Sequence, residues 1–398
     1  MTVRAVLRDA NHNHTLEVGE RFTLELDVAN QGPVAAEQVD VHVDGTPSVV
    51  DQLHAPIHIG TLPAGEHRRL VLSGTVPTLA SSEQAEIVLT VRTPNDASAA
   101  SRKRQFLLGV RAGASAVDVR SIAIDHPPSV KKGHAQTDAV AIAVGVGTYR
   151  DPLVATSPLA ARDATVVGHY FKRTFGIPTD RIKVLTDAQA LRDDLAQVFE
   201  QWLPSKAKTH PVVYVYVAGR AAVDPQTGAV ALVPHDGQPG SQYRLYPLSR
   251  LHAALAALPQ ARAVVILDLS LEPSGTALDT AAVPTWKPEI RHALDGRLLQ
   301  IVGNTGLQDA HELPAPQHGL FTFYVLKALS GEADASHTGR VLWKDLCGYV
   351  SSQVQQQAQE LFGQPQVSFC EPDPQTLPGF EALAVMPTVD RKGSAPVR

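Results

Sequence analysis

The chain has 398 residues, with 35 Lys and Arg against 40 Asp and Glu, which gives a formal charge of −5. This length exceeds what one compact domain usually needs, so we expect two domains. An apolar share of 44% supports full hydrophobic cores and excludes a mainly disordered chain. The mild acidity, with no basic face, argues against a nucleic-acid partner.

The cysteine content, the spacing of the histidines and the hydropathy exclude further classes of protein. The only cysteines are Cys347 and Cys370, too few for a disulfide scaffold or a clustered zinc site. The sixteen histidines are scattered, with no His-Glu-x-x-His pattern, so we expect no metal site. No apolar run approaches the roughly 18 residues that span a bilayer, and the N-terminal stretch lacks the features of a signal peptide. A soluble cytoplasmic protein without a membrane partner is therefore predicted.

The first part of the chain, residues 1–112, has the alternation of β-strands. Clear examples are 21–29, 39–43, 69–73 and 86–91. Short strands separated by Gly- and Pro-containing turns predict an antiparallel sandwich of immunoglobulin type. The run VGERFTLELDVANQGPVAAEQVDVHV, followed by IGTLPAGEHRRLVL, also resembles immunoglobulin-like adhesion-type domains of prokaryotic multidomain proteins.

Residues 113–136 are expected to be a linker. The paired Pro127-Pro128 disfavours both a helix and a fully paired strand, so this segment should be extended and exposed. Basic residues lie just before it, at Arg102–Arg104, and within it, at Lys131-Lys132. Residues 375–398 are expected to be a C-terminal tail.

From residue 137 to 374 the pattern changes to alternating strands and helices. Expected strands are 138–145, 181–185, 211–217, 261–267, 297–302 and 366–369, and expected helices are 157–175, 191–203, 248–258, 318–329 and 343–362. Continuous apolar strands between helices predict a mostly parallel sheet covered on both faces. Ligands bind at the carboxyl ends of such strands, so a site is expected just after Val217 and Leu267.

Nucleotide-binding motifs are absent from this region. Gly145-Val146-Gly147 follows the first strand but lacks the third glycine of a dinucleotide-binding turn, and no Gly-Lys-Ser/Thr phosphate loop occurs. We therefore expect a tight turn at this point and no cofactor.

Several sequence blocks in this region carry a family resemblance. They are AVAIAVGVGTYRDP, VVYVYVAGRA, AVVILDLSLEPSG and HGLFTFYVLKAL. In this order they resemble a caspase-like cysteine protease domain of the bacterial metacaspase type, over residues 138–370. The resemblance implies the caspase-like α/β fold, with a catalytic histidine and cysteine on neighbouring strands.

The sequence departs from that family at both catalytic positions. Arg220 stands where the histidine is expected, and Ser270 stands where the cysteine is expected. The family's chemistry needs a thiolate activated by an imidazole, whereas a guanidinium cannot accept a proton near neutrality. A serine without a base is a very weak nucleophile. We expect a catalytically inactive domain.

Two retained carboxylates are the candidate pocket residues. The resemblance implies that Asp163 and Asp268 line a pocket for a basic substrate side chain. Three alternatives stay open: the pocket still binds a basic peptide, Arg220 fills and neutralises it, or the roles are structural. In the structural alternative, Asp163 pairs with Arg162 or Lys172 on its own helix, and Asp268 bonds backbone amides.

Other residues that could restore catalysis are less suited to it. Cys347 and Cys370 lie far along the chain from the expected cleft and are expected to be buried thiols. His235 follows a strand next to that of Ser270, but a surface-turn histidine is the expected role.

These inferences predict a regulatory pseudo-protease. It would bind, inhibit, serve as an adaptor for, or be cleaved by an active caspase-like partner in a prokaryotic signalling or defence system. The basic segments Arg102–Arg104 and Lys131-Lys132 would suit cleavage by a protease that prefers basic residues. One alternative is a hydrolase with Ser270 as an unconventional nucleophile. Another is an interaction module whose function lies in the β-sandwich.

Overall fold

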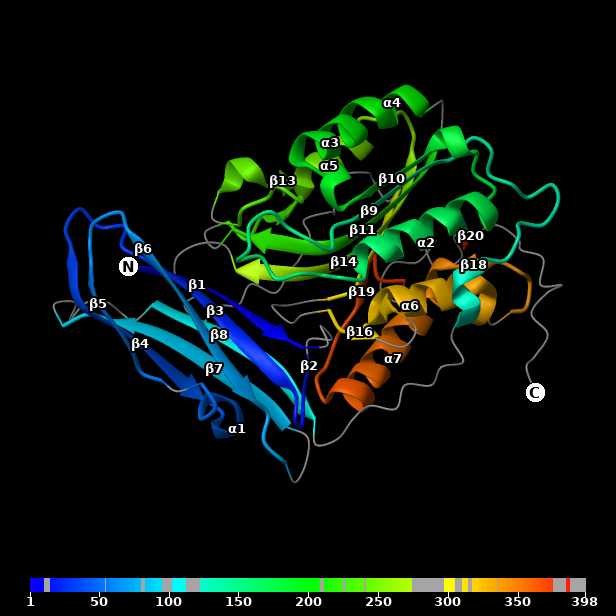
Figure 1. Ribbon diagram of the computed structural model, residues 1–398. Coiled ribbons are helices and arrows are strands. Elements are labelled where there is room, and N and C mark those ends of the chain that lie inside the picture. Colours follow the sequence, from blue (N-terminus) through cyan, green and yellow to red (C-terminus); the bar gives the residue numbers. More distant parts are fainter. Residues whose placement is uncertain are drawn as a thin grey trace.

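A computed structural model describes most of the chain. The described residues are 1–10, 15–53, 55–79, 83–94, 102–111, 122–207, 211–224, 227–239, 241–273, 297–304, 310–313, 317–334, 336–374 and 384–386. Figure 1 shows the N-terminal strands, coloured blue to cyan, beside a sheet with helices on its faces, coloured green to orange.

The N-terminal part consists almost entirely of strands. They are β1 (Thr2–Asp9), β2 (Thr15–Glu17), β3 (Arg21–Ala29), β4 (Ala36–Gly45), β5 (Ile57–Leu62), β6 (His67–Thr75), β7 (Glu83–Arg92) and β8 (Arg102–Arg111), with the short helix α1 (Pro47–Val50). They form a three-stranded sheet, β1-β3-β6, and a five-stranded sheet, β2-β8-β7-β4-β5. Every pairing is antiparallel except that of β2 with β8.

Both sheets contribute to one hydrophobic cluster. The alternation expected for residues 21–29 is observed, because Phe22, Leu24 and Leu26 of β3 are buried. Val41 of β4 and Ile87 of β7 belong to the same cluster. Burying one face of each strand in this way fixes the strand register, since a one-residue slip would expose every apolar side chain.

The second part alternates strands and helices. Its strands are β9 (Val140–Gly145), β10 (Ile182–Thr186), β11 (Val212–Val223), β12 (Val230–Leu232), β13 (Tyr246–Pro247), β14 (Arg262–Pro273), β15 (Leu298–Val302), β16 (Glu312–Leu313), β17 (His318–Gly319), β18 (Val341–Leu342), β19 (Phe369–Glu371) and β20 (Ala384–Met386). Its α-helices are α2 (Ala160–Arg173), α3 (Arg192–Gln197), α4 (Leu203–Lys206), α5 (Leu248–Ala256), α6 (Leu320–Lys327) and α7 (Trp343–Phe362). Short 3-10 turns are η1 (Ile122–Asp125), η2 (Thr179–Arg181), η3 (Asp187–Gln189) and η5 (Gln242–Arg244), and π-type turns are η4 (Val198–Trp202) and η6 (Ala328–Glu332).

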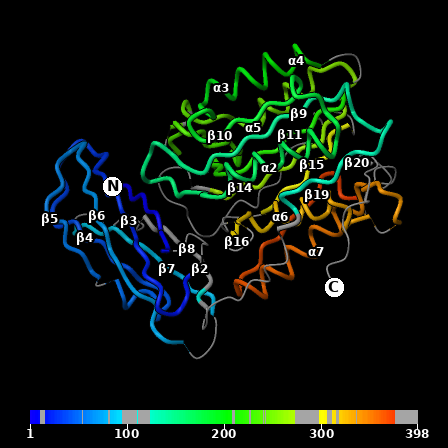
Figure 2. Tube along the Cα trace, turned by 45° about the vertical axis from the view of Figure 1, so that its right-hand side comes forward, coloured from blue at the N-terminus to red at the C-terminus, as the bar shows by residue number. Residues whose placement is uncertain are grey.

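The central sheet is mostly parallel, as expected. Its strand order is β10-β9-β11-β14-β15-β19, and only β19 along this path runs antiparallel to its neighbour. One hydrophobic cluster joins the sheet to α2, α6 and α7, and a second joins the other face to α3 and α5. Figure 2 shows α3 and α4 on one side of the strands and α6 and α7 on the other.

Three strand boundaries differ from the sequence prediction. The strands β11 and β14 continue to Val223 and Pro273, well past the expected ends at 217 and 267. The closing strand is Phe369–Glu371 instead of 366–369. The buried side chain of Gln366 explains that shift, because it binds the backbone of Gly303 and His311 instead of continuing the sheet.

The expectation of an extended and exposed linker is wrong for part of its described residues, 122–136. They begin with the turn η1, bury Ile124 and Pro127, and lie against the end of α2. Val130 N–H donates to Arg173 O at 2.9 Å, and Gln136 N–H donates to Phe175 O at 2.9 Å. The pair Lys131-Lys132 nevertheless stays exposed. Residues 113–121 of the expected linker lie outside the described residues, as does the expected tail except for 384–386.

The two cysteines do not remain thiols. Cys347 of α7 and Cys370 of β19 form a disulfide across a sequence separation of 23 residues. The expectation of two buried thiols is therefore wrong. The helix α7 packs beside β19 and brings Cys347 next to a residue that spacing along the chain does not place near it. Within the described residues, no helix is both long and apolar enough to cross a bilayer.

Replacing Cys347 with Ser is expected to destabilise the protein. A disulfide that closes a loop of this length contributes about 3 kcal/mol, mainly by restricting the unfolded chain. Urea unfolding of C347S should give a lower free energy of unfolding than the oxidised parent, and Cys370→Ser should match it. The parent treated with a reductant serves as the control and should behave like both variants. Two titratable thiols in the unreduced, denatured parent would contradict the disulfide.

Candidate functional site

Two neighbouring parallel strands bring the candidate catalytic positions together. In the register of β11 and β14, Arg220 is opposite Ser270, and Ala218 is opposite Asp268. The strand extensions noted above create these pairings. The two positions that depart from the caspase-like pattern are therefore side by side at the carboxyl end of the sheet.

Gly219 allows the loop after β9 to approach this strand end. Its φ is +137°, and a Cβ there would be 2.8 Å from both Tyr149 Oη and Val146 O. Tyr149 donates its hydroxyl proton to Val146 O at 2.9 Å and accepts the N–H of Arg220 at 2.8 Å. A side chain at position 219 would break this arrangement, so the local sequence needs glycine.

Arg220 is buried, with 2% of its surface exposed. Its Nε donates to Ala155 O at 3.2 Å, and its Nη2 donates to Thr156 O at 3.0 Å. A guanidinium stays charged at all physiological pH values, and carbonyl dipoles partly replace the water it has lost. Arg220 thus ties β11 to the loop before α2, and it offers no proton acceptor.

Ser270 is equally buried, at 3% exposure. Its Oγ accepts the N–H of Ala310 at 2.7 Å. His235 lies in the loop after β12, where its Nδ1 is 2.7 Å from Thr148 O. Within the described residues, no imidazole is hydrogen-bonded to Ser270, so the arrangement contains no serine–base pair.

Asp163 is bound by a network centred on His318. One carboxylate oxygen is hydrogen-bonded to His318 Nδ1, and the other accepts the N–H of Gly319 at 2.9 Å. His318 Nε2 lies 3.0 Å from Asp125, which also forms a 2.7 Å ion pair with Arg162. The partner of Asp163 is therefore neither Arg220 nor a basic residue of its own helix, but a histidine far along the chain.

Asp268 has only one of its oxygens satisfied. Its Oδ2 accepts the hydroxyl proton of Thr322 at 2.6 Å. Its Oδ1 is buried and has no hydrogen-bond partner among the described residues. In the same part of the chain, no hydrogen bond or ion pair joins Arg220 to Asp163 or Asp268.

Asp163 and Asp268 do line the same cavity, but its volume is only about 20 Å³. Its other lining residues include Ser270, Glu312, Gly219 and Gly319. That volume suits about one water molecule and not an arginine or lysine side chain. Glu312 of β16 contributes a third carboxylate, 7% exposed, which accepts the N–H of Leu159 at 3.5 Å.

Burial changes the protonation of these carboxylates. Loss of hydration raises the pKa of Asp268 to about 7, and the neighbouring charge of Asp163 adds to the increase, although the Thr322 hydrogen bonds oppose it. Burial also raises the pKa of Asp163, against the lowering effect of His318, and raises that of Glu312 well above its usual value. Asp268 therefore retains a proton into the neutral range, and burial shifts the pKa values of the other two carboxyl groups in the same direction.

The sequence analysis missed three of these residues. Glu312, His318 and Thr322 were not singled out, although 318–322 lies in a block that resembles the caspase-like pattern. The available signal was chemical: His318 lies two residues before the first residue of α6, and Thr322 is a polar residue within the otherwise apolar stretch 320–326. Such residues are buried only where they find hydrogen-bond partners.

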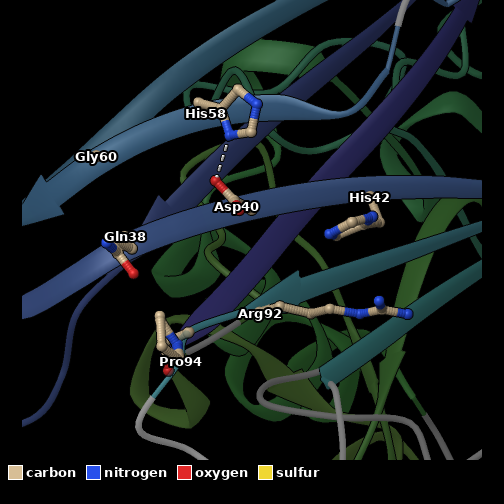
Figure 3. Close-up of a pocket in the computed structure, with 8 residues that line it drawn as sticks. Gln38, Asp40, His42, His58, Gly60, Arg92 and Pro94 are labelled. Atoms are coloured by element: carbon tan, nitrogen blue, oxygen red, sulfur yellow. Dashed lines mark hydrogen bonds and ion pairs between the residues drawn. The ribbon is translucent and has the colours of Figure 1, made fainter.

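A second cavity lies on the outer face of the five-stranded sheet. It has a volume of about 550 Å³ and is lined by Asp40, His42, His58 and Arg92, among others. Figure 3 shows His58 of β5 bonded to Asp40 of β4, and His42 of β4 and Arg92 of β7 also line the cavity. The side chains at 38, 40 and 42 share this face because Val39 and Val41 point into the core.

Comparison with known proteins shows a remote structural similarity. A caspase-1 structure from Spodoptera frugiperda is 13% identical, with a TM-score of 0.39, over 62% of this chain and 90% of that one. A protein from Geobacter sulfurreducens is also 13% identical, with a TM-score of 0.41, over 63% of this chain and 99% of that one. No protein-family model matches the sequence, and no curated protein matches it.

Asp268→Asn is expected to flatten the dependence of stability on pH. Between pH 3.8, the ordinary pKa, and about 7, the folded chain holds a proton on Asp268 that the unfolded chain releases. The free energy of unfolding therefore falls as the pH rises through this window, by up to about 1.4 kcal/mol per pH unit from this group. The variant lacks that proton, so relative to the parent it should be more stable at pH 7.5 than at pH 5.

Urea unfolding at a series of pH values measures this slope. The matched control is Asp193→Asn, because the Asp193 side chain is 92% exposed and its replacement should leave the slope unchanged. Equal slopes for D268N and the parent would show that Asp268 titrates normally in the folded protein.

Proposed function

We propose that the chain is a caspase-like pseudo-protease with a regulatory role. One observation carries the proposal: the arginine and the serine that stand at the family's catalytic positions are paired across β11 and β14. Neither can perform the chemistry of the residue it replaces. Arg220 cannot accept a proton, and Ser270 has its Oγ bonded to a backbone N–H.

The closed acidic cavity supports the same proposal. A caspase-like enzyme with specificity for basic residues needs an open pocket for a long cationic side chain. Here the retained carboxylates line a cavity of about 20 Å³, and Glu312 lines it with them. The acidic positions then serve as a buried hydrogen-bonding cluster, and recognition of a partner would use other surfaces.

We further propose that the N-terminal strands form an immunoglobulin-like domain. The support is the sequence alternation, the antiparallel pairing and the single core shared by the two sheets. Such a domain would supply a second interaction surface. The proposed partner is an active caspase-like protease of a prokaryotic signalling or defence system, which this chain would inhibit, recruit or be cleaved by.

Two features of the chain bear on its cellular location. The sequence favours the cytoplasm, where reducing conditions keep most thiols free. The Cys347–Cys370 disulfide counts against that location, because such bonds persist mainly in oxidising compartments. The oxidation state of Cys347 and Cys370 in cell extracts would decide between the cytoplasm and an oxidising compartment.

The purified chain is expected to show no peptidase activity. Peptide amides with Arg or Lys at the cleavage site should be hydrolysed at the buffer rate by both the parent and Ser270→Ala, because no imidazole among the described residues is hydrogen-bonded to Ser270. A fluorophosphonate probe tests the rival hydrolase function with Ser270 as nucleophile. Labelling of the parent that Ser270→Ala abolishes would overturn the pseudo-protease proposal.

Cleavage by an active caspase-like protease with basic specificity is expected at Lys131 or Lys132. Both residues are exposed in a turn, whereas the backbone of Arg102–Arg104 is paired with β7. Limited protease treatment followed by mass spectrometry should therefore find the first cut at 131 or 132. Replacing both lysines with Gln should protect the chain, and the matched control with Gln at 102–104 should not. If the parent chain is not cut, it is not a substrate of such a protease, and the inhibitor and adaptor roles are the ones that stay proposed.

A further inference from the structure

A large polar cleft lies where the two parts of the chain meet. It has a volume of about 590 Å³. One wall is the outer face of the β1-β3-β6 sheet, and the other consists of the loops after β9 and β12 together with η5. In Figure 1 the arrowheads of β11 and β14 point toward the N-terminal strands, so the cleft is at the edge of the central sheet where its strands end.

Two contacts join the walls. Arg4 of β1 forms a 2.9 Å ion pair with Asp151, and Arg8 donates to Pro152 O at 2.7 Å. Asp151 also accepts the N–H of Leu153 at 3.0 Å, which fixes its carboxylate. The cleft therefore has a defined shape, because bonds between the two parts fix the position of its walls.

The carboxylates of the cleft are already engaged. Asp27 is bonded to His67 at 2.8 Å, Asp151 to Arg4, and Asp236 to the N–H of Arg192 at 2.9 Å. The ion pair with Arg4 offsets the charge of Asp151, whereas hydrogen bonding orients Asp27 and Asp236 without removing their charge. The four arginines of the lining therefore exceed its three carboxylates by one.

Three arginines in the lining lack such partners. Arg69 comes from β6, Arg150 from the loop after β9, and Arg244 from η5. All three are exposed, and none makes a side-chain hydrogen bond or ion pair within the described part of the chain. They come from both walls, in a protein whose overall charge is −5. Guanidinium groups in this arrangement are suited to paired hydrogen bonds with phosphate oxygens.

We propose that this cleft binds a small anion carrying two or more phosphate groups. Its volume lies in the range of small-ligand pockets. Among the described residues, no Phe, Tyr or Trp lines it and Leu153 is its largest apolar residue, so hydrophobic anchoring of a peptide has little support. Charge and bidentate hydrogen bonding are the recognition that the lining offers. This binding is independent of whether the α/β part is a pseudo-protease.

Inorganic pyrophosphate is the probe, measured by isothermal titration calorimetry on the full chain at low ionic strength. We expect Arg69→Gln, Arg150→Gln and Arg244→Gln each to weaken binding about tenfold, which equals about 1.4 kcal/mol. Pyrophosphate should also raise the melting temperature of the parent more than that of any of the three variants.

Arg68→Gln is the matched control. Arg68 is adjacent to Arg69 and equally exposed, but successive side chains of a strand point to opposite faces, so its replacement should leave the affinity unchanged. No binding by the parent, or the same loss in R68Q as in R69Q, would overturn the proposal. Sulfate binding as tightly as pyrophosphate would overturn the need for two phosphates, and tighter binding of a polyglutamate peptide would overturn the ligand class.

Discussion

The burial of charge at the carboxyl end of β11 and β14 determines most of what this site can do. Moving an ion from water into a protein interior costs several kcal/mol unless other groups replace its hydration. For Arg220, which cannot lose its proton, carbonyl oxygens of the loop before α2 supply that replacement. For Asp268 the replacement is incomplete, and the group responds with a raised pKa. One constraint therefore has two outcomes, set by whether the buried group can become neutral.

The bonds of Arg220, Asp163 and Asp268 hold the surrounding elements close together, so little open space is left between them. The guanidinium fixes the loop that precedes α2, while Asp163 is bound to His318 and to a backbone N–H at the start of α6. Gly319 is required there, since a Cβ would lie 2.8 Å from Asp268 Oδ2. Helix, strand and loop thus meet around a space for one water. A cluster bonded in this way stabilises the junction of its elements, and a catalytic pocket at the same place would have to leave that space open.

Much of the fold follows from local sequence. The strand β3 alternates apolar and polar residues, which predicts a strand buried on one face. The strand β9 is apolar throughout, which predicts a strand buried on both faces. Strand ends were harder to predict. Residues 218–223 and 268–273 contain small and polar residues, and their strand conformation depends on pairing with each other. The disulfide was missed for a related reason, because only the packing of α7 beside β19 brings Cys347 to Cys370.

The sequence by itself determined that position 220 carries a guanidinium and position 270 a hydroxyl, so neither of these two side chains supplies a thiolate or an imidazole. This followed because the chemistry of Arg220 and Ser270 depends on residue type, whatever surrounds them. Only the tertiary structure decided which partners the acidic residues have. Glu312 and His318 reach Asp163 and Asp268 from segments distant along the chain. Hydrogen bonding and hydration depend on distances in space, and spacing along the chain does not encode those distances.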